Sequence, residues 1–320
     1  MKSVTISTFS LRVKTHKGKR VEYYRLDRLP LARKRSGAPA YKNLLDLLDE
    51  YFRRLKRTPA HDSTNLCILT ASNIKRETRS VSAFLEKGEY GIQNDLMHIR
   101  RKAVTHQRMV EDAEMMPYYF LAAIPKESKR GLIGFQVEGE TSIKGYFEQC
   151  FEDFLRHKCG ECDLEIERVV PKRLMNQYLT SGRVSRLRFV HLKVPKEIEE
   201  SYMLEDIAND ATIELQVKAK RGSAYLLTSN IRSLLRRYKE GDDFVQIEGY
   251  EYDTLKVDVE VGGKSRTIDL AAPNKFRAGY NVTGKVVMKN GHPTYLSIDK
   301  VGREIVREIM HSLRLDPKGV

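Results

Sequence analysis

The sequence predicts an α+β protein in which mixed or antiparallel sheets are flanked by helices. Patterns typical of strands and of helices occur in blocks and do not alternate regularly, which argues against a doubly wound parallel sheet. Two-residue turns typical of β-hairpins, Gly262-Gly263 and Asn290-Gly291, join alternating runs late in the chain. A length of 320 residues favours two domains, which we expect at residues 1–165 and 166–320.

The beginning of the chain predicts two strands, a helix and a third strand. Val4–Val13 alternates apolar and polar residues, and Val21–Leu26 follows after a basic loop, so both are expected to be strands. From Leu44 to Leu55, apolar residues recur at helical spacing and predict an amphipathic helix that ends in a basic turn. Asn65–Thr70 is the next strand candidate. Arg33–Pro39 is expected to be an exposed loop, because its cations could not be buried together.

The most apolar passage lies in the middle of the first half. Tyr118–Pro125 is a near-continuous apolar run that ends at a proline, and Gly131–Glu138 returns after a charged turn. The two runs predict a hairpin of central strands. A helix with an aromatic face is expected from Gly145 to His157. Residues 71–116 are polar and basic, with only a weak helical pattern from Asn94 to Glu114.

The second half predicts further strands, with an acidic helix and a basic helix among them. Strands are expected at Leu164–Val170, Arg186–Val194 and Ile213–Ala219. Helices are expected at Lys196–Ala208, Thr228–Lys239 and Lys300–Leu313. The two hairpins would pair Leu255–Val261 with Ser265–Leu270, and Gly284–Met288 with Thr294–Ile298.

The charge balance indicates a polyanionic partner. Lysine and arginine number 57 against 43 acidic residues, for a net charge of +14. A field of this sign attracts nucleic acid or an acidic membrane surface. The first residues lack the apolar core of a signal peptide, and no stretch is apolar and long enough to span a membrane. Four cysteines are too few for a disulfide scaffold, so we expect a cytoplasmic protein.

Basic clusters recur along the chain and often contain aromatic residues. In a strand, Arg186 and Arg188 would lie on one face, with Leu187 and Phe189 on the other. Such a sheet would offer a cationic surface above a packed core, although each cluster could equally be a solvated face. The candidate nucleic-acid-binding residues are Lys17, Lys19, Arg20, Arg183, Arg186, Arg188, Lys218, Lys220, Arg221, Arg236 and Arg237.

The sequence contains no motif for reading bases. Zinc-finger spacing, a basic zipper, an aromatic ribonucleoprotein motif and a clear helix-turn-helix pair are all absent. We therefore expect binding dominated by the phosphate backbone and of weak sequence specificity, with double-stranded DNA favoured.

A magnesium-dependent nuclease is the main alternative function. Gln216-Val217-Lys218 resembles the carboxylate-and-lysine strand motif of such enzymes, and Asp210 or Glu214 could supply the carboxylate. The spacing is poor, because Asp210 is too close and Glu214 lacks a second acidic partner. Phosphate-binding, dinucleotide-binding, zinc-protease and serine-hydrolase motifs are absent, so a non-enzyme without cofactors is favoured.

The cysteines suggest a metal site that the sequence supports only in part. Cys159-Gly160-Glu161-Cys162 is close to His157 and Cys150, and four such ligands could close a tetrahedral site. However, Cys150 falls on the apolar face of the expected helix, and there is no second Cys-x-x-Cys. We expect structural cysteines and no metal.

The order of segments from Tyr118–Ala122 through Ile133–Phe135 and Glu138-Gly139 to Phe147 resembles the RexA family of phage-exclusion proteins. Pro171–His191, with Leu174-Met175 ahead of Gly182-Arg183, and the basic strand Ile213–Arg221 continue the resemblance. The resemblance implies a dimeric, DNA-binding cytoplasmic sensor of an abortive-infection system that works beside a small integral membrane protein. KwaB-like defence proteins are a neighbouring possibility. Residues 239–299 depart from the pattern. A non-catalytic protein-interaction or anti-restriction protein is the second alternative.

Overall fold

The chain forms two compact units in the computed structural model. The structure describes residues 3–17, 20–32, 40–138, 141–169, 183–190, 214–220, 225–226, 254–261, 264–269 and 279–320. Unit 1 comprises Met1–Val169 with Gly279–Val320, and unit 2 comprises Val170–Ala278. The sequence placed residues 279–320 in the second domain, whereas the structure groups them with the N-terminal residues.

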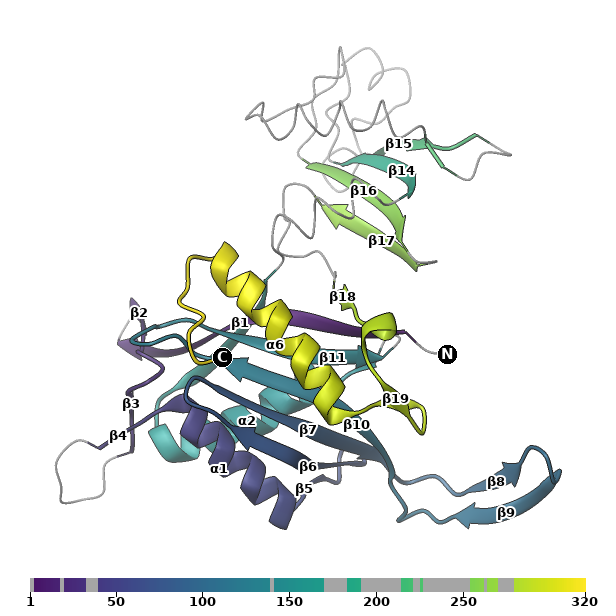
Figure 1. The fold of residues 1–320 in the computed structure, drawn as a ribbon, viewed down its shortest axis with the longest axis horizontal. Coiled ribbons are helices and arrows are strands. Elements are labelled where there is room, and N and C mark those ends of the chain that lie inside the picture. The colour runs from purple at the N-terminus through teal and green to yellow at the C-terminus, as the bar shows by residue number, and fades with distance from the viewer. Residues whose placement is uncertain are drawn as a thin grey trace, which may run out of the picture. The chain divides into compact units, whose positions relative to one another are not determined.

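Unit 1 is built on one antiparallel sheet (Figure 1). Its main path is ordered β13-β1-β11-β10-β7-β6-β5, and β2, β12 and β18 pair beside this path. The strands of the path are β1 (Val4–Lys17), β5 (Ala60–Asp62), β6 (Cys67–Arg76), β7 (Ser80–Glu89), β10 (Glu114–Ala123), β11 (Gly131–Glu138) and β13 (Asp163–Arg168). The strands beside it are β2 (Arg20–Tyr23), β12 (Thr141–Ser142) and β18 (Tyr280–Asn281).

Two helices cover one face of this sheet, α1 (Leu44–Arg57) and α2 (Lys144–Cys159). The side chain of Asn43 caps α1 by accepting a hydrogen bond of 2.9 Å from the backbone N–H of Leu45. Aromatic rings from both helices and from the sheet fill the core between them. Its largest members include Phe52, Phe120, Phe135, Phe147 and Phe151.

The C-terminal helix α6 (Tyr295–Ser312) covers the opposite face (Figure 1). Side chains such as Ile298 and Val306 pack there against Ile6 and Leu121 of the sheet. Because both faces of β10 are covered, its second half, from Tyr118 to Ala123, is apolar without interruption. None of the helices in the described ranges is long and apolar enough to cross a membrane.

The predicted hairpin of central strands is present. β10 pairs with β11 in antiparallel register, with Phe120 opposite Phe135. Alternation along β10 sends Phe120 toward α1 and α2, and Tyr119 and Leu121 toward α6. The α+β class with antiparallel sheets is therefore confirmed for the described residues.

Unit 2 contains a four-stranded antiparallel sheet ordered β15-β14-β16-β17. Its strands are β14 (Arg183–Val190), β15 (Glu214–Lys218), β16 (Thr254–Val261) and β17 (Lys264–Asp269). β16 pairs with β17 on either side of Gly262-Gly263, where the sequence predicted a hairpin. The predicted helices at 196–208 and 228–239, and the predicted loop at 33–39, lie outside the described residues.

Two predicted elements are wrong. The weak helical pattern from Asn94 to Glu114 is a hairpin of β8 (Asn94–His98) and β9 (Ala103–Arg108). Asn290-Gly291 does form a turn, with positive φ at both residues, but the flanking strands are only β19 (Met288–Lys289) and β20 (His292–Pro293). The predicted return strand instead begins α6, because the apolar residues that follow recur at helical spacing. A further small pair is β3 (Leu29–Pro30) with β4 (Tyr41–Lys42), and a short 3-10 helix η2 covers Thr283–Lys285.

Candidate nucleic-acid interface

The sheet of unit 2 has one apolar and one polar face. Leu187 and Phe189 of β14 are buried, as are Val257 and Val259 of β16. On β14, Arg186 and Arg188 lie on the opposite face from Leu187 and Phe189, as the alternation of a strand predicts. We call the side bearing Arg183, Arg186, Arg188, Glu214, Gln216, Lys218, Lys256, Asp258 and Glu260 the polar sheet face.

Carboxylates neutralise the two central arginines of the polar sheet face. Asp258 Oδ2 lies 3.5 Å from Nε of Arg186, and Asp258 Oδ1 accepts a hydrogen bond of 3.2 Å from Nη2 of Arg188. Glu214 Oε1 lies 3.8 Å from Nη1 of Arg188. Asp258 also accepts a hydrogen bond of 2.6 Å from the hydroxyl of Thr267. Arg186 and Arg188 are therefore held by protein carboxylates, which lowers their availability to phosphate.

The remaining predicted residues are scattered. Lys218 lies opposite Arg186 in the register, and both Lys218 and Lys220 are exposed. The guanidinium of Arg183 lies 5.1 Å from the ring centroid of Tyr225 in a cation–π contact. Arg20 is exposed at the start of β2. The side chain of Lys17 and the residues Lys19, Arg221, Arg236 and Arg237 lie outside the described part of the chain.

The nuclease alternative gains no support from β15. Glu214 and Gln216 do share a face, but Gln216 Nε2 donates a hydrogen bond of 3.1 Å to Glu214 Oε2, and Arg188 neutralises the same carboxylate. Asp210 lies outside the described residues. Within the described ranges, no group of three or more His, Cys, Asp or Glu side chains could hold a metal ion.

The four cysteines are free thiols, and all but Cys150 are buried. Cys159 and Cys162 are buried at the end of α2, where Cys162 Sγ donates to the backbone carbonyl of Cys159 at 3.7 Å. Burial is also the main cause that raises the pKa of the Cys150 thiol, which lies near the hydroxyls of Tyr51 and Tyr146. A raised pKa keeps a thiol protonated and unreactive at neutral pH.

The sequence reasoning missed an exposed hairpin, β8–β9, which we call the arm (Asn94–Arg108). It continues the β7–β10 pair, which ends where Glu89 lies opposite Glu114, and it extends away from the end of the sheet (Figure 1). Arg108 fixes its base: Nε donates to the Asp112 carbonyl at 3.0 Å, and Nη2 donates to the Glu89 carbonyl. All other side chains of the arm are exposed.

The tip of the arm concentrates positive charge. Ile99, Arg100, Arg101 and Lys102 form the loop, which is closed by a hydrogen bond of 2.8 Å from the N–H of Lys102 to the carbonyl of His98. Lys102 has a φ of 51°, the left-handed conformation that ends such a loop. No acidic residue occurs from Leu96 to Val110. In the described part of the chain, no carboxylate forms an ion pair with these three loop cations, whereas Arg186 and Arg188 are both paired with Asp258.

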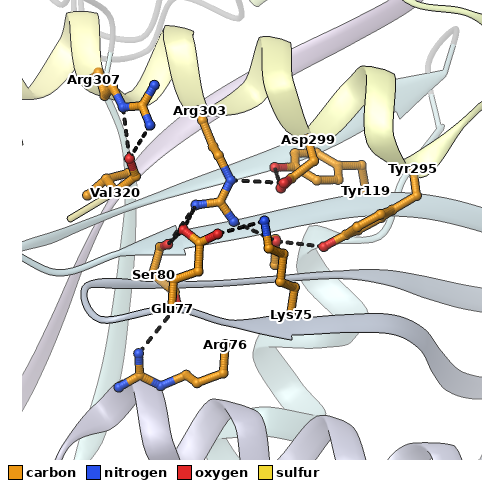
Figure 2. A network of polar contacts seen from close by, with 11 residues as sticks. Lys75, Arg76, Glu77, Ser80, Tyr119, Tyr295, Asp299, Arg303, Arg307 and Val320 are labelled. Atoms are coloured by element: carbon orange, nitrogen blue, oxygen red, sulfur yellow. Dashed lines mark hydrogen bonds and ion pairs between the residues drawn. The ribbon is translucent and has the colours of Figure 1, made fainter.

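A second polar cluster lies beneath α6 and joins it to the sheet (Figure 2). Arg303 donates from Nε to Asp299 at 2.9 Å, and from Nη1 to Glu77 at 2.6 Å and to Ser80 at 2.8 Å. Asp299 accepts a further hydrogen bond of 2.8 Å from the hydroxyl of Tyr119. Burial, followed by the charge of Asp299, raises the pKa of Tyr119 well above its ordinary value.

The cluster under α6 is fully satisfied, which distinguishes it from a reactive site. Nη2 of Arg303 donates to Ser82 at 3.1 Å, and the Ser82 hydroxyl lies 2.8 Å from that of Tyr295. Buried charges of this kind are stable only when each is paired and hydrogen-bonded, as here. We interpret the cluster as the structural attachment of α6.

Of the two candidate surfaces compared above, the arm presents exposed cations without competing carboxylates, and the polar sheet face does not. A scan against protein-family models finds no match to this chain, and a search of curated proteins also finds none. The functional assignment therefore depends on the geometry and charge of the chain itself.

Proposed function

We propose that the protein binds nucleic acid, with double-stranded DNA favoured, through phosphate contacts of weak sequence specificity. The observation that supports this most directly is the arm tip, where Arg100, Arg101 and Lys102 are exposed and no acidic residue is close in sequence. Three adjacent cations on a projecting hairpin can reach phosphates that a flat surface cannot. The net charge of +14 adds a field that attracts polyanions at longer range.

The proposal assigns the main contact to the arm and a lesser one to the polar sheet face. Arg186 and Arg188 are already paired with Asp258, so a phosphate would have to displace a carboxylate to reach them. Lys218 and Lys220 are exposed and can add contacts without this cost.

Binding to a labelled duplex at several salt concentrations tests the proposal. Each phosphate contact releases counterions, so the logarithm of affinity falls linearly with the logarithm of salt, by about 0.9 per contact. Replacing Arg100, Arg101 and Lys102 by alanine should reduce this slope by about three contacts and weaken binding by orders of magnitude at low salt. The loss should be similar for unrelated duplex sequences.

The matched control replaces Arg54, Lys56 and Arg57 by alanine. These three cations are also exposed, lie at the end of α1 and change the net charge equally. The control should keep most of the salt slope, because it alters only the overall field. A third variant, in which Arg186, Arg188, Lys218 and Lys220 become alanine, should lose less than the arm variant. Equal effects of all three variants, or a native protein that is insensitive to salt, would contradict the proposal.

We further propose that this binding serves a cytoplasmic sensor of an anti-phage defence system. The support is the resemblance to the RexA family, which also implies a homodimer and a small integral membrane protein as partner. The four free cysteines suit a reducing compartment. Expression with a membrane protein encoded beside it should protect cells from phage, and the arm variant should abolish that protection. Protection that survives the arm variant would separate defence from nucleic-acid binding.

A further inference from the structure

The loop at the tip of the arm begins with an isoleucine that is almost fully exposed. Ile99 is 89% exposed and lies in the loop between His98 and Arg100. Loop positions usually hold glycine, asparagine, aspartate, serine or proline, each of which has a local reason to be there. A branched apolar side chain gains nothing from this loop in water. Its presence indicates that another surface covers it.

The rest of the arm also presents apolar side chains. Leu96, Met97 and Val104 are all at least half exposed, and Met97 lies opposite Val104 in the register. A two-stranded hairpin is marginally stable in water without a surface to cover its apolar side chains. Because cations directly follow Ile99, the covering surface must be anionic at its rim and apolar within.

A nucleic-acid duplex has this combination. Phosphates line the rims of each groove, and the stacked base pairs between them are apolar. Proteins that bend DNA often insert an apolar wedge, isoleucine among them, between base pairs from the minor groove. Neighbouring arginine and lysine residues then hold the phosphates on either side of the opened step.

We infer that Ile99 inserts between adjacent base pairs and bends the duplex, an inference that rests on the nucleic-acid binding proposed above. Arg100, Arg101 and Lys102 anchor the tip to the phosphates. Arg108 fixes the base of the arm to the backbone carbonyls of Glu89 and Asp112, so the hairpin enters the duplex as one piece. The protein is then an architectural binder and not a passive polycation.

A wedge also predicts which duplexes bind best. Opening a stacked step is easiest at a mismatch, because pairing and stacking are already weakened there. Pyrimidine–purine steps are the most easily kinked in perfect duplexes. We expect the native protein to bind a duplex with a central mismatch about tenfold more tightly than the perfect duplex. The mismatched step is already partly unstacked, so less free energy is spent on opening it.

The experiment uses the full chain and two single variants, Ile99→Ala and Ile92→Ala. Ile92 is also an exposed isoleucine, at 62%, but it precedes β8 at the base of the arm. Energy transfer between dyes at the two ends of a short duplex reports the bend, and 2-aminopurine fluorescence at the central step reports unstacking. Binding to vesicles of phosphatidylcholine and phosphatidylserine is measured in parallel.

The native protein and Ile92→Ala should bend the duplex by an angle on the order of 20–90° and raise the 2-aminopurine signal. Ile99→Ala should lose the bend, the signal and the mismatch preference while keeping its salt slope. If the native protein binds without bending, or if Ile99→Ala bends as well as the native protein, the wedge is wrong and the proposed function stands. If the native protein binds no duplex, the proposed function itself fails. If Ile99→Ala loses only vesicle binding, the covering surface is a membrane and the wedge is wrong.

Discussion

Arg303 and Asp299 form an ion pair inside unit 1, four residues apart on α6, and each is 6% exposed. Asp49 and Arg53 form the same i,i+4 pair on α1, but the side chain of Arg53 is largely exposed. The two pairs have the same chemistry in different surroundings. Removing one partner of a buried pair leaves an uncompensated charge, whereas an exposed charge is solvated by water.

We expect Asp299→Ala to destabilise the protein by about 3 kcal/mol, because the guanidinium of Arg303 loses a buried partner. Asp49→Ala should cost less than about 1 kcal/mol. Chemical denaturation monitored by circular dichroism measures both. Similar losses for the two variants would mean that the attachment of α6 does not depend on this pair.

Glu77 makes the same cluster sensitive to acid. Burial alone would raise the pKa of the Glu77 carboxyl, but the hydrogen bond from Lys75 and the charge of Arg303 hold that pKa below its ordinary value. A carboxyl whose pKa is lower in the folded state stabilises the fold above its unfolded pKa, and this contribution is lost as the pH falls through the folded pKa.

The variant Glu77→Gln should therefore be less stable than the native protein near pH 7. The difference should shrink as the pH falls below about 4.3, the ordinary pKa of glutamate, toward the lower pKa of the folded state. Denaturation curves at a series of pH values measure this difference. A difference that does not change with pH would show that Glu77 contributes through its shape and hydrogen bonds alone.

At the scale of elements, α6 approaches the sheet closely because residue 302 is glycine. A Cβ at this position would lie 2.6 Å from Cε1 and 2.9 Å from the hydroxyl oxygen of Tyr119. Tyr119 is fully buried and bonded to Asp299, so it cannot move aside easily. A Cβ at Gly145, in the first turn of α2, would have no atom within 4 Å among those compared.

We expect Gly302→Ala to destabilise the protein by about 1–3 kcal/mol, the usual cost of overpacking a core, despite the better helix propensity of alanine. Gly145→Ala should be neutral or stabilising by at most about 1 kcal/mol. The thermal unfolding of both variants, measured side by side, distinguishes the cost of overpacking the core from the gain in helix propensity. A stabilised Gly302→Ala would mean that α6 can shift outward at little cost.

The elements that could be predicted from the sequence are those with a buried face. Tyr118–Pro125 and the helix from Leu44 were predictable because burial on one or both sides leaves an apolar pattern. The arm leaves no such pattern, because nearly all its side chains are exposed, so Asn94–Glu114 looked weakly helical. The basic run at 100–102 and the missing acids around it were the available signal.

The neutralisation of the predicted arginines could not be found from the sequence. The face shared by Arg186 and Arg188 follows from alternation alone. The register of β14 with β16, however, places Asp258 directly opposite Arg186, and the two residues are 72 positions apart by their numbers. Which carboxylate lies beside which cation depends on long-range strand pairing, which composition and periodicity do not contain.

At the scale of the whole molecule, unit 2 is inserted in the chain between β13 and β18, two strands of unit 1 that both pair with β1. β13 runs along β1 with Arg168 opposite Phe9, and the N–H of Val169 donates to the carbonyl of Thr8 at 3.0 Å. After unit 2, the chain pairs with β1 again through β18, with Tyr280 opposite Ile6. Continued by one residue each, these registers place Val169 opposite Thr8 and Gly279 opposite Ser7, which are neighbouring positions along β1.

This geometry predicts that deleting residues 170–278 leaves a unit that still folds. A direct bond from Val169 to Gly279 would place Gly279 opposite Ser7 and keep both β13 and β18 in their present register with β1. All of the core under α1, α2 and α6 that the structure describes lies outside the deleted segment. The shortened protein should therefore unfold in one cooperative transition, measured by circular dichroism and calorimetry.

The same deletion separates the two candidate surfaces, because the arm belongs to unit 1 and the polar sheet face to unit 2. If the arm makes the main contact, the shortened protein should bind duplex DNA with most of the native salt slope, and alanine at Arg100, Arg101 and Lys102 should abolish this binding. A folded but non-binding protein would move the interface to unit 2. An unfolded protein would instead show that unit 1 needs unit 2 for stability, despite the matching register of its two ends.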